Sequence, residues 1–151
     1  MKYIIVDSEG DGLAYDCTKL HVLGYSYDGI DYHHTGDYDA MRFILSGSHE
    51  DRRLVCHNAI RHDLVVFNRI LGIDLTYRDF VDTLPLSWTI NYTRQKHGLG
   101  SYGDDYGVPK PLVDDWVGLT YEEYAHRVVE DCKIQWRLWT DLEHKLGVLY
   151  G

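Results

Sequence analysis

Residues 2–12, KYIIVDSEGDG, contain the pattern that decides the fold of this chain. The apolar, β-branched run from Lys2 to Val6 predicts a buried strand, and the Asp-Ser-Glu-Gly that follows predicts that this strand enters a loop. Side chains alternate along a strand, so Asp7 and Glu9 lie on the same face. Two carboxylates this close repel each other strongly unless a hard cation such as Mg²⁺ or Mn²⁺ lies between them.

Two other interpretations of this stretch are open. Asp and Gly are ordinary turn residues, so the same letters fit a solvated turn between a strand and a loop. The same stretch also resembles the start of an EF-hand calcium loop, through Asp7, Glu9, Asp11 and Gly12. The calcium interpretation fails because Thr18 stands at the position of the bidentate Glu and because the preceding segment is strand-like.

The next two strands form a predicted hairpin. Asp28-Gly29 separates the segments His21–Tyr27 and Ile30–His34, and this dipeptide is typical of a two-residue hairpin turn. The chain therefore opens with three strands in an antiparallel meander.

The rest of the chain alternates between strands and helices. Asp37 is a candidate N-cap for a helix that ends near Ser46. The later elements are a strand at 53–56, a helix at 61–71, a strand at 80–83, a helix through Leu86 and Trp88, a glycine-rich stretch at 98–107, a loop around Pro109 and Pro111, and a long closing helix capped by Thr120 and Glu123. A meander followed by this alternation predicts an α/β fold with a mixed sheet and helices on its faces.

A second carboxylate motif lies in residues 55–69, VCHNAIRHDLVVFNR. Asp63 falls in the first turn of the predicted helix, where the helix dipole keeps a carboxylate ionised and available as a ligand. A simple acid at a helix start is an equally good interpretation. His57 and His62 could also suggest zinc together with Cys56, but their spacing matches no zinc signature.

The third motif lies in residues 124–136, YAHRVVEDCKIQW, on the closing helix. Asp131 lies beside the apolar stripe of this helix, and such a carboxylate is costly unless it is paired or bound to a metal. His126 precedes it by five residues, which is about 140° around a straight helix. The two side chains can therefore cooperate only if the helix breaks near His126, and a surface histidine is the alternative.

Composition limits the class of protein. The chain has 151 residues with 44% hydrophobic composition, which is enough for a substantial core, so we expect a single domain over 1–151. No apolar run is long enough for a membrane span or a signal peptide, and the three cysteines form no CxxC pair, so we expect a cytoplasmic protein with reduced thiols. The net charge of −9 gives no general attraction for nucleic acid, although a bound divalent cation can reverse the sign locally.

Taken together, the three motifs resemble the DEDD superfamily of 3′-to-5′ exonucleases, which has the ribonuclease H-like fold. Asp-x-Glu on the first strand, an Asp after an Asn-containing loop, and His-x4-Asp on the last helix occur in the family order and span positions 7 to 131. The intervening stretches DTLPLSW (82–88), HGLGSYG (97–103) and YGVPK (106–110) are similar to the proofreading exonuclease domains of phage and bacterial DNA polymerases.

The resemblance implies a site with defined roles. Two divalent ions, Mg²⁺ or Mn²⁺, would be held by four carboxylates, those of Asp7, Glu9, Asp63 and Asp131. His126 would be the general base. Glu9 would also contact the terminal 3′-hydroxyl, and the substrate contacts would further include Gly12, Leu13 and Asn58. The tyrosine subclass of the family would need Tyr at position 127, where this chain has Arg127, so the histidine subclass is favoured and Tyr124 is the reserve candidate.

The function implied is 3′-to-5′ exonucleolytic cleavage of single-stranded DNA or frayed 3′ ends, with RNA left open. Because the chain carries no polymerase module, it resembles a stand-alone exonuclease, such as a phage-encoded one, or a proofreading subunit of a separate DNA polymerase. One alternative is a ribonuclease H-like endonuclease. Another is a non-catalytic module that binds single strands by tyrosine stacking and by the basic residues Arg61, Arg94, Lys96 and Lys110.

Overall fold

The computed structural model describes residues 2–46, 51–108 and 118–150. In chain order the elements are β1 (Lys2–Gly10), β2 (Leu20–Ser26), β3 (His33–Thr35), α1 (Tyr38–Ser46), β4 (Arg52–Cys56), η1 (Ala59–Asp63), α2 (Leu64–Leu71), η2 (Tyr77–Asp79), β5 (Phe80–Asp82), α3 (Thr83–Ile90), α4 (Leu99–Tyr106) and α5 (Tyr121–Tyr150). The predicted loop around Pro109 and Pro111 lies outside the described residues, as does Lys110.

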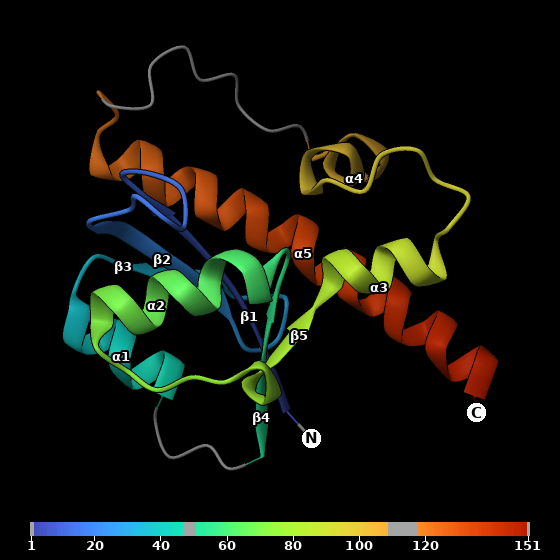
Figure 1. The fold of residues 1–151 in the computed structure, drawn as a ribbon. Coiled ribbons are helices and arrows are strands. Elements are labelled where there is room, and N and C mark those ends of the chain that lie inside the picture. Colours follow the sequence, from blue (N-terminus) through green and yellow to red (C-terminus); the bar gives the residue numbers. More distant parts are fainter. Residues whose placement is uncertain (1, 47–50, 109–117, 151) are drawn as a thin grey trace.

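The strands form one five-stranded sheet in the order β3-β2-β1-β4-β5 (Figure 1). β2 pairs with β1 and with β3 in antiparallel fashion, whereas β4 pairs with β1 and with β5 in parallel fashion. This arrangement confirms the predicted mixed sheet, which begins with an antiparallel meander. It also places β1, which carries Asp7 and Glu9, in the middle of the sheet.

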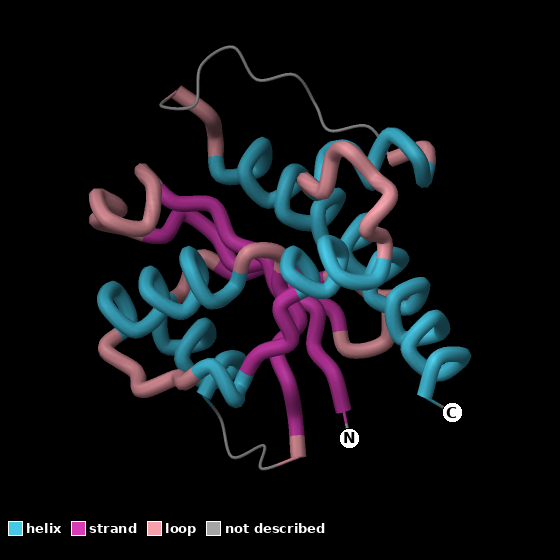
Figure 2. The backbone as a smooth tube through the Cα atoms, turned by 45° about the vertical axis from the view of Figure 1, so that its right-hand side comes forward, coloured by secondary structure: helices cyan, strands magenta, loops and turns pink. Residues whose placement is uncertain are grey.

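Helices cover both faces of the sheet (Figures 1 and 2). α1 and α2 pack on the face that carries Ile4 and Val6, while α5, with α3 and α4, packs on the face that carries Ile5 and Val55. Both faces of β1 are therefore buried, which explains why its sequence is a continuous apolar run and not an alternating one. Within the described part of the chain, no helix is long and apolar enough to cross a membrane.

One local prediction was wrong, and one helix was not predicted. The β2–β3 connection is longer than a two-residue turn, because the Asp28 carboxylate accepts hydrogen bonds from the backbone N–H groups of Ile30 and Asp31 and β3 begins only at His33. Within the glycine-rich stretch at 98–107, residues Leu99–Tyr106 form the helix α4, which the sequence analysis did not predict. Its Leu99 and Tyr102 side chains are buried, and this burial offsets the cost of glycine in a helix.

Gly24 allows α5 to lie directly on the sheet. Gly24 is the β2 partner of Asp7 across the antiparallel pair, so a side chain there would point to the same face as Asp7. A Cβ atom added at Gly24 would lie 2.8 Å from Cγ2 of Val128, a distance that real structures do not show. The missing side chain therefore brings α5 close to β1, and Asp131 lies one helical turn beyond Val128.

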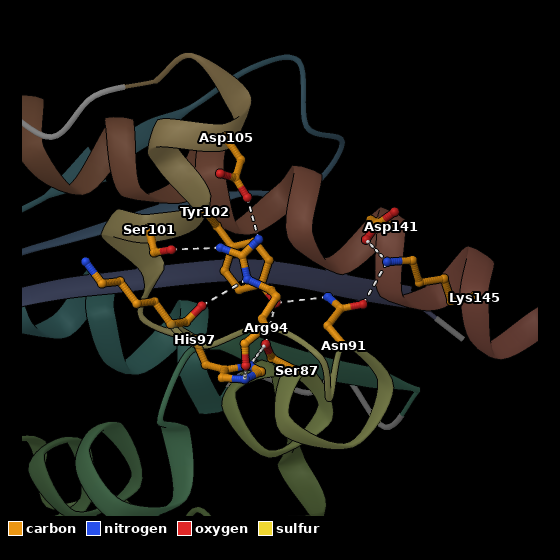
Figure 3. Close-up of polar contacts among 10 residues, drawn as sticks. Ser87, Asn91, Arg94, His97, Ser101, Tyr102, Asp105, Asp141 and Lys145 are labelled. Atoms are coloured by element: carbon orange, nitrogen blue, oxygen red, sulfur yellow. Dashed lines mark hydrogen bonds and ion pairs between the residues drawn. The ribbon is translucent and has the colours of Figure 1, made fainter.

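A polar network joins α3, α4 and α5 (Figure 3). The buried Ser87 hydroxyl hydrogen-bonds Nδ1 of His97 at 2.6 Å and also contacts the Tyr102 hydroxyl. Asn91 donates to the same Tyr102 oxygen at 2.9 Å and accepts from Lys145 of α5 at 2.7 Å. The segment between β5 and α5 is thus fixed to the closing helix by polar contacts as well as by apolar packing.

Candidate active site

Three carboxylates meet where β1 faces α5. One ligand atom from each of Asp7, Glu9 and Asp131 can be chosen so that all three atoms lie within 4.8 Å of one another. Asp7 and Glu9 share a face of β1 through the two-residue strand period, and the close approach of α5 at Gly24 brings Asp131 to them. We call Asp7, Glu9 and Asp131 the carboxylate cluster.

Asp7 shows that the cluster suits a cation. Burial raises the pKa of the Asp7 carboxyl well above its usual value, and the charges of Asp131, Glu9 and Asp63 raise it further. The Oδ2 atom of Asp7 is buried and has no hydrogen-bond partner among the described residues. A donor set made only of carboxylate oxygens fits a hard divalent cation such as Mg²⁺ or Mn²⁺.

Asp63 lies near the cluster but outside its 4.8 Å group. Its charge is among those that raise the pKa of Asp7, so it faces the same region. The side chain is buried, and burial raises its own pKa, while His62, with Nδ1 3.8 Å from the Asp63 carboxylate, opposes that rise. Asp63 is the last residue of the π-helical turn η1 and directly precedes α2, whereas the sequence predicts it within the first turn of a single helix over 61–71.

Asp82, which was not among the predicted site residues, fixes the turn before Asp63. Asn58 has the left-handed backbone conformation, with φ of 69°, which Asn tolerates better than most residues. The Asp82 carboxylate accepts hydrogen bonds from the backbone N–H groups of Asn58 and Ile60, at 2.9 and 3.1 Å. It also caps α3 by accepting from Leu84, and an Asp directly before a helix was the signal that could have identified it.

A cleft of about 680 Å³ opens beside the cluster. Its lining residues are Ser8, Glu9, Gly10, Asp11, Gly12, Leu13, Asp16, Lys19, His21, His62 and Tyr124. The cleft therefore brings Glu9 together with Gly12 and Leu13, as the resemblance implies. Leu13 is 59% exposed, so its apolar side chain is available to a ligand in the cleft.

The loop that carries Gly12 and Leu13 has its own internal support. Asp11 accepts hydrogen bonds from the backbone N–H groups of Thr18 and Lys19 at 2.7 and 3.0 Å and from the Thr18 hydroxyl, and these bonds lower the pKa of the Asp11 carboxyl. Arg69 of α2 donates to two carbonyls of the same loop. Asp11 thus closes the loop, which gives a structural reason to reject the calcium-loop alternative.

His57 is held by hydrogen bonds to Thr83 and His97. Its Nδ1 is hydrogen-bonded to the Thr83 hydroxyl at 2.9 Å and its Nε2 to the His97 carbonyl at 2.7 Å. Both ring nitrogens are engaged, so His57 offers no ligand atom for the zinc alternative.

The helix break that His126 requires is absent. α5 is continuous from Tyr121, its start is stabilised by the reciprocal hydrogen bonds of Thr120 and Glu123, and His126 is exposed on it. His126 and Asp131 therefore point in different directions, and this correction follows from the regular helix. Tyr124 is instead buried, lines the cleft and stacks on His21 with ring centroids 4.3 Å apart.

Arg127 contributes a positive charge to the cluster. The side chain is buried, and its Nε atom lies 3.5 Å from Oε1 of Glu9. In the sequence Arg127 stood only as a departure from the tyrosine subclass, because its contact with Glu9 depends on the packing of α5 against β1.

Comparison with solved structures identifies the fold. The chain matches Brucella melitensis NrnC bound to pGG with a TM-score of 0.74 and 17% identity, over 97% of this chain and 74% of that one. It matches Escherichia coli RNase D, an exoribonuclease involved in structured RNA processing, with a TM-score of 0.63 and 19% identity, over 95% and 40% of the two chains. Exonuclease X in complex with 5′ overhanging duplex DNA gives 0.53 and 17%, over 96% and 93%.

These matches show a ribonuclease H-like exonuclease fold, which confirms the resemblance to the DEDD exonucleases at the level of the fold. No family model and no curated protein matches the sequence. The narrower resemblance to the proofreading domains of polymerases stays a prediction. Another structure of Brucella melitensis NrnC contains bound Mg²⁺ and matches this chain with a TM-score of 0.71 and 19% identity, over 97% of this chain and 74% of that one.

Proposed function

We propose that this protein is a divalent-metal-dependent 3′-to-5′ exonuclease that acts on single-stranded DNA or frayed 3′ ends. The observation that carries the proposal is the carboxylate cluster, with the buried Asp7 Oδ2 atom lacking a hydrogen-bond partner, at the edge of a cleft. Three clustered carboxylates with Asp63 nearby are unfavourable for a protein that only binds nucleic acid, because their charges repel one another.

The metal ligands follow from the positions of the acids. Asp7, Glu9 and Asp131 would hold one divalent ion, and Asp63 would join Asp7 in holding a second. The bound ions would activate the attacking water and stabilise the oxygen that leaves the scissile phosphate. Asp7 is central to both sites because the charges of the other three acids all reach it.

The cleft would hold the terminal nucleotide. Glu9 and Leu13 line it together, so Glu9 would accept a hydrogen bond from the 3′-hydroxyl while Leu13 packs against the terminal base. Lys19 lies in the same wall and supplies a positive charge for a phosphate. Asn58 would act through the backbone, by shaping the turn that leads to Asp63.

Two side chains of α5 are candidates for handling the proton of the attacking water, Tyr124 and His126. Tyr124 precedes Asp131 by seven residues, which is two turns of α5, so it shares the face of Asp131 and its hydroxyl would orient the attacking water. In this role the Tyr124 hydroxyl would be a hydrogen-bonding partner of the water. His126 would serve as the base only if the first turn of α5 opened.

The test uses single-stranded DNA and RNA of one sequence, labelled at the 5′ end, with Mg²⁺, Mn²⁺ or chelator. A descending ladder in the presence of metal, and none in chelator, is the expected result. A 3′-phosphate should block the reaction, and the comparison of DNA with RNA identifies the preferred sugar. Addition of a separate DNA polymerase with a mismatched primer terminus tests the proofreading partner.

Two outcomes would replace the proposal with an alternative. Cleavage of circular single-stranded DNA would indicate a ribonuclease H-like endonuclease. Binding without metal-dependent cleavage would indicate a non-catalytic module, although Arg94, one of its proposed phosphate ligands, is already engaged by Asp105 and Ser101.

A further inference from the structure

Arg127 is an unusual component of an acidic metal site. It lies on α5 four residues before Asp131, which is about one helical turn, so both side chains face β1. Arg127 is only 7% exposed, and its Nε atom lies 3.5 Å from the Glu9 carboxylate. The cluster therefore includes a cation that is part of the polypeptide chain.

The burial of Arg127 needs a reason. A guanidinium remains charged under all conditions in which proteins fold, and burying it is costly unless an anion faces it. Glu9 provides that anion, and Glu9 in turn lies within the reach of the repelling charges of Asp7 and Asp131. Glu9 thus offsets the cost of burying the Arg127 charge, and Arg127 offsets the repulsion of Glu9 by Asp7 and Asp131.

We propose that Arg127 is a positioning residue that holds the Glu9 carboxylate and acts as a fixed counter-ion of the cluster. The proposal rests on the metal site of the proposed function. In the absence of metal, Arg127 offsets part of the repulsion among the acids, so the protein folds without a divalent cation. When metal binds, the positive charge of Arg127 lowers the affinity of the cluster for that ion.

The proposal predicts a change in cation binding when the charge is removed. Arg127→Gln keeps a hydrogen-bonding side chain next to Glu9 but removes the charge. The guanidinium lies 3.5 Å from Glu9, one of the carboxylates that would hold the ion, so its charge disfavours a divalent cation there and its removal should increase Mn²⁺ affinity about fivefold or more. Arg127→Lys keeps the charge and should leave Mn²⁺ affinity within about twofold of that of the natural protein.

The measurements are calorimetric titration with Mn²⁺ and the unfolding temperature in chelator and in saturating Mg²⁺. Arg127→Gln should unfold at a lower temperature in chelator, and Mg²⁺ should raise its unfolding temperature more than that of the natural protein. Arg137→Met is the matched control, because it removes a charge from an exposed position of the same helix. This control should leave both Mn²⁺ affinity and the response to Mg²⁺ unchanged.

The possible failures are distinguishable. If the natural protein binds no Mn²⁺, the metal site of the proposed function is wrong. If it binds Mn²⁺ but Arg127→Gln has the same affinity and the same response to Mg²⁺, only the role of Arg127 is overturned. An Arg127→Gln protein that does not fold even in saturating Mg²⁺ also overturns it, since the proposal requires metal to replace the lost charge.

Discussion

Asp7 lowers the stability of the metal-free protein when its carboxylate is ionised, the form in which it would bind a metal. Its raised pKa means that the folded protein holds a proton that the unfolded chain, with an ordinary value near 3.8, has already released. The metal-free protein therefore loses stability as the pH rises from about this value through the raised pKa. Metal binding removes that dependence, because the cation stabilises the ionised carboxylate.

The first prediction follows for Asp7→Asn. In chelator at pH 7 the variant should unfold at a higher temperature than the natural protein, by at least about 2–4 °C, the shift that 1 kcal/mol gives in a chain of this size. Near pH 4 the difference should shrink. Metal-dependent cleavage should fall by more than the 10- to 100-fold that the loss of an outer-shell partner costs. Thermal unfolding at the two pH values and a cleavage assay check both effects, and substantial cleavage by the variant would contradict the metal site.

The second prediction concerns the two candidates for handling the proton. Tyr124→Phe should slow cleavage by roughly 10- to 100-fold, because the hydroxyl that orients the water is lost, while Mn²⁺ affinity is unchanged. His126→Ala should stay close to the natural rate, because His126 is exposed on a continuous helix. Single-turnover cleavage measures both variants. The reverse result, with His126→Ala about 10²- to 10⁴-fold slower, would show that the first turn of α5 opens during the reaction.

At the scale of elements, the site depends on how closely α5 lies on β2. The third prediction is that Gly24→Ala destabilises the fold by about 1–3 kcal/mol, the usual cost of overpacking, and weakens Mn²⁺ binding because Asp131 moves away from Asp7. Urea unfolding and calorimetric titration measure the two effects.

A second substitution and a control make this test specific. Val128→Ala removes Cγ2, the nearest atom that the new Cβ would meet, but leaves the Val128 Cβ at 2.9 Å, so Gly24→Ala should cost somewhat less in a Val128→Ala background than alone. Gly147→Ala adds a Cβ on the same helix with no atom within 4 Å, and it should be neutral or slightly stabilising. Strictly additive costs at Gly24 and Val128 would contradict the contact.

The same scale shows what local sequence patterns can predict. The strand β1 and the caps of α1 and α5 depend on neighbouring residues, and the sequence predicts them; at α1 the Asp37 carboxylate accepts from the backbone N–H of Asp39 at 2.8 Å. The helix α4 and the Asp82 contacts depend on segments that are distant in the chain, so local patterns miss them. Asp7 and Glu9 are recognisable from their two-residue spacing, whereas Arg127 gains its role only when α5 is placed on β1.

At the scale of the whole molecule, the charge of −9 limits how nucleic acid can be bound. Few basic residues face the cleft, so we expect a weak salt dependence for binding of a single strand. Each neutralised phosphate contributes about 0.7 to the slope of log affinity against log salt for a single strand. The fourth prediction is that Lys19→Gln lowers this slope by about 0.7, measured by fluorescence anisotropy in the Asp7→Asn background.

Lys2→Gln provides the matched control for this measurement. Lys2 lies at the opposite end of β1 from Glu9, so the loss of its charge should leave the slope unchanged. Equal effects of the two substitutions would indicate that the net charge, and not the cleft, controls binding.

The carboxylate cluster is assembled from β1 and α5, which lie at opposite ends of the chain. The first strand supplies Asp7 and Glu9 and the last helix supplies Asp131, so neither half of the polypeptide contains a complete ligand set. Under the proposed function, the protein would become active only after α5 has been synthesised and has packed on the sheet. The same division would allow the protein to be expressed as two separate chains, neither with the proposed nuclease activity, which would return only when the two chains associate.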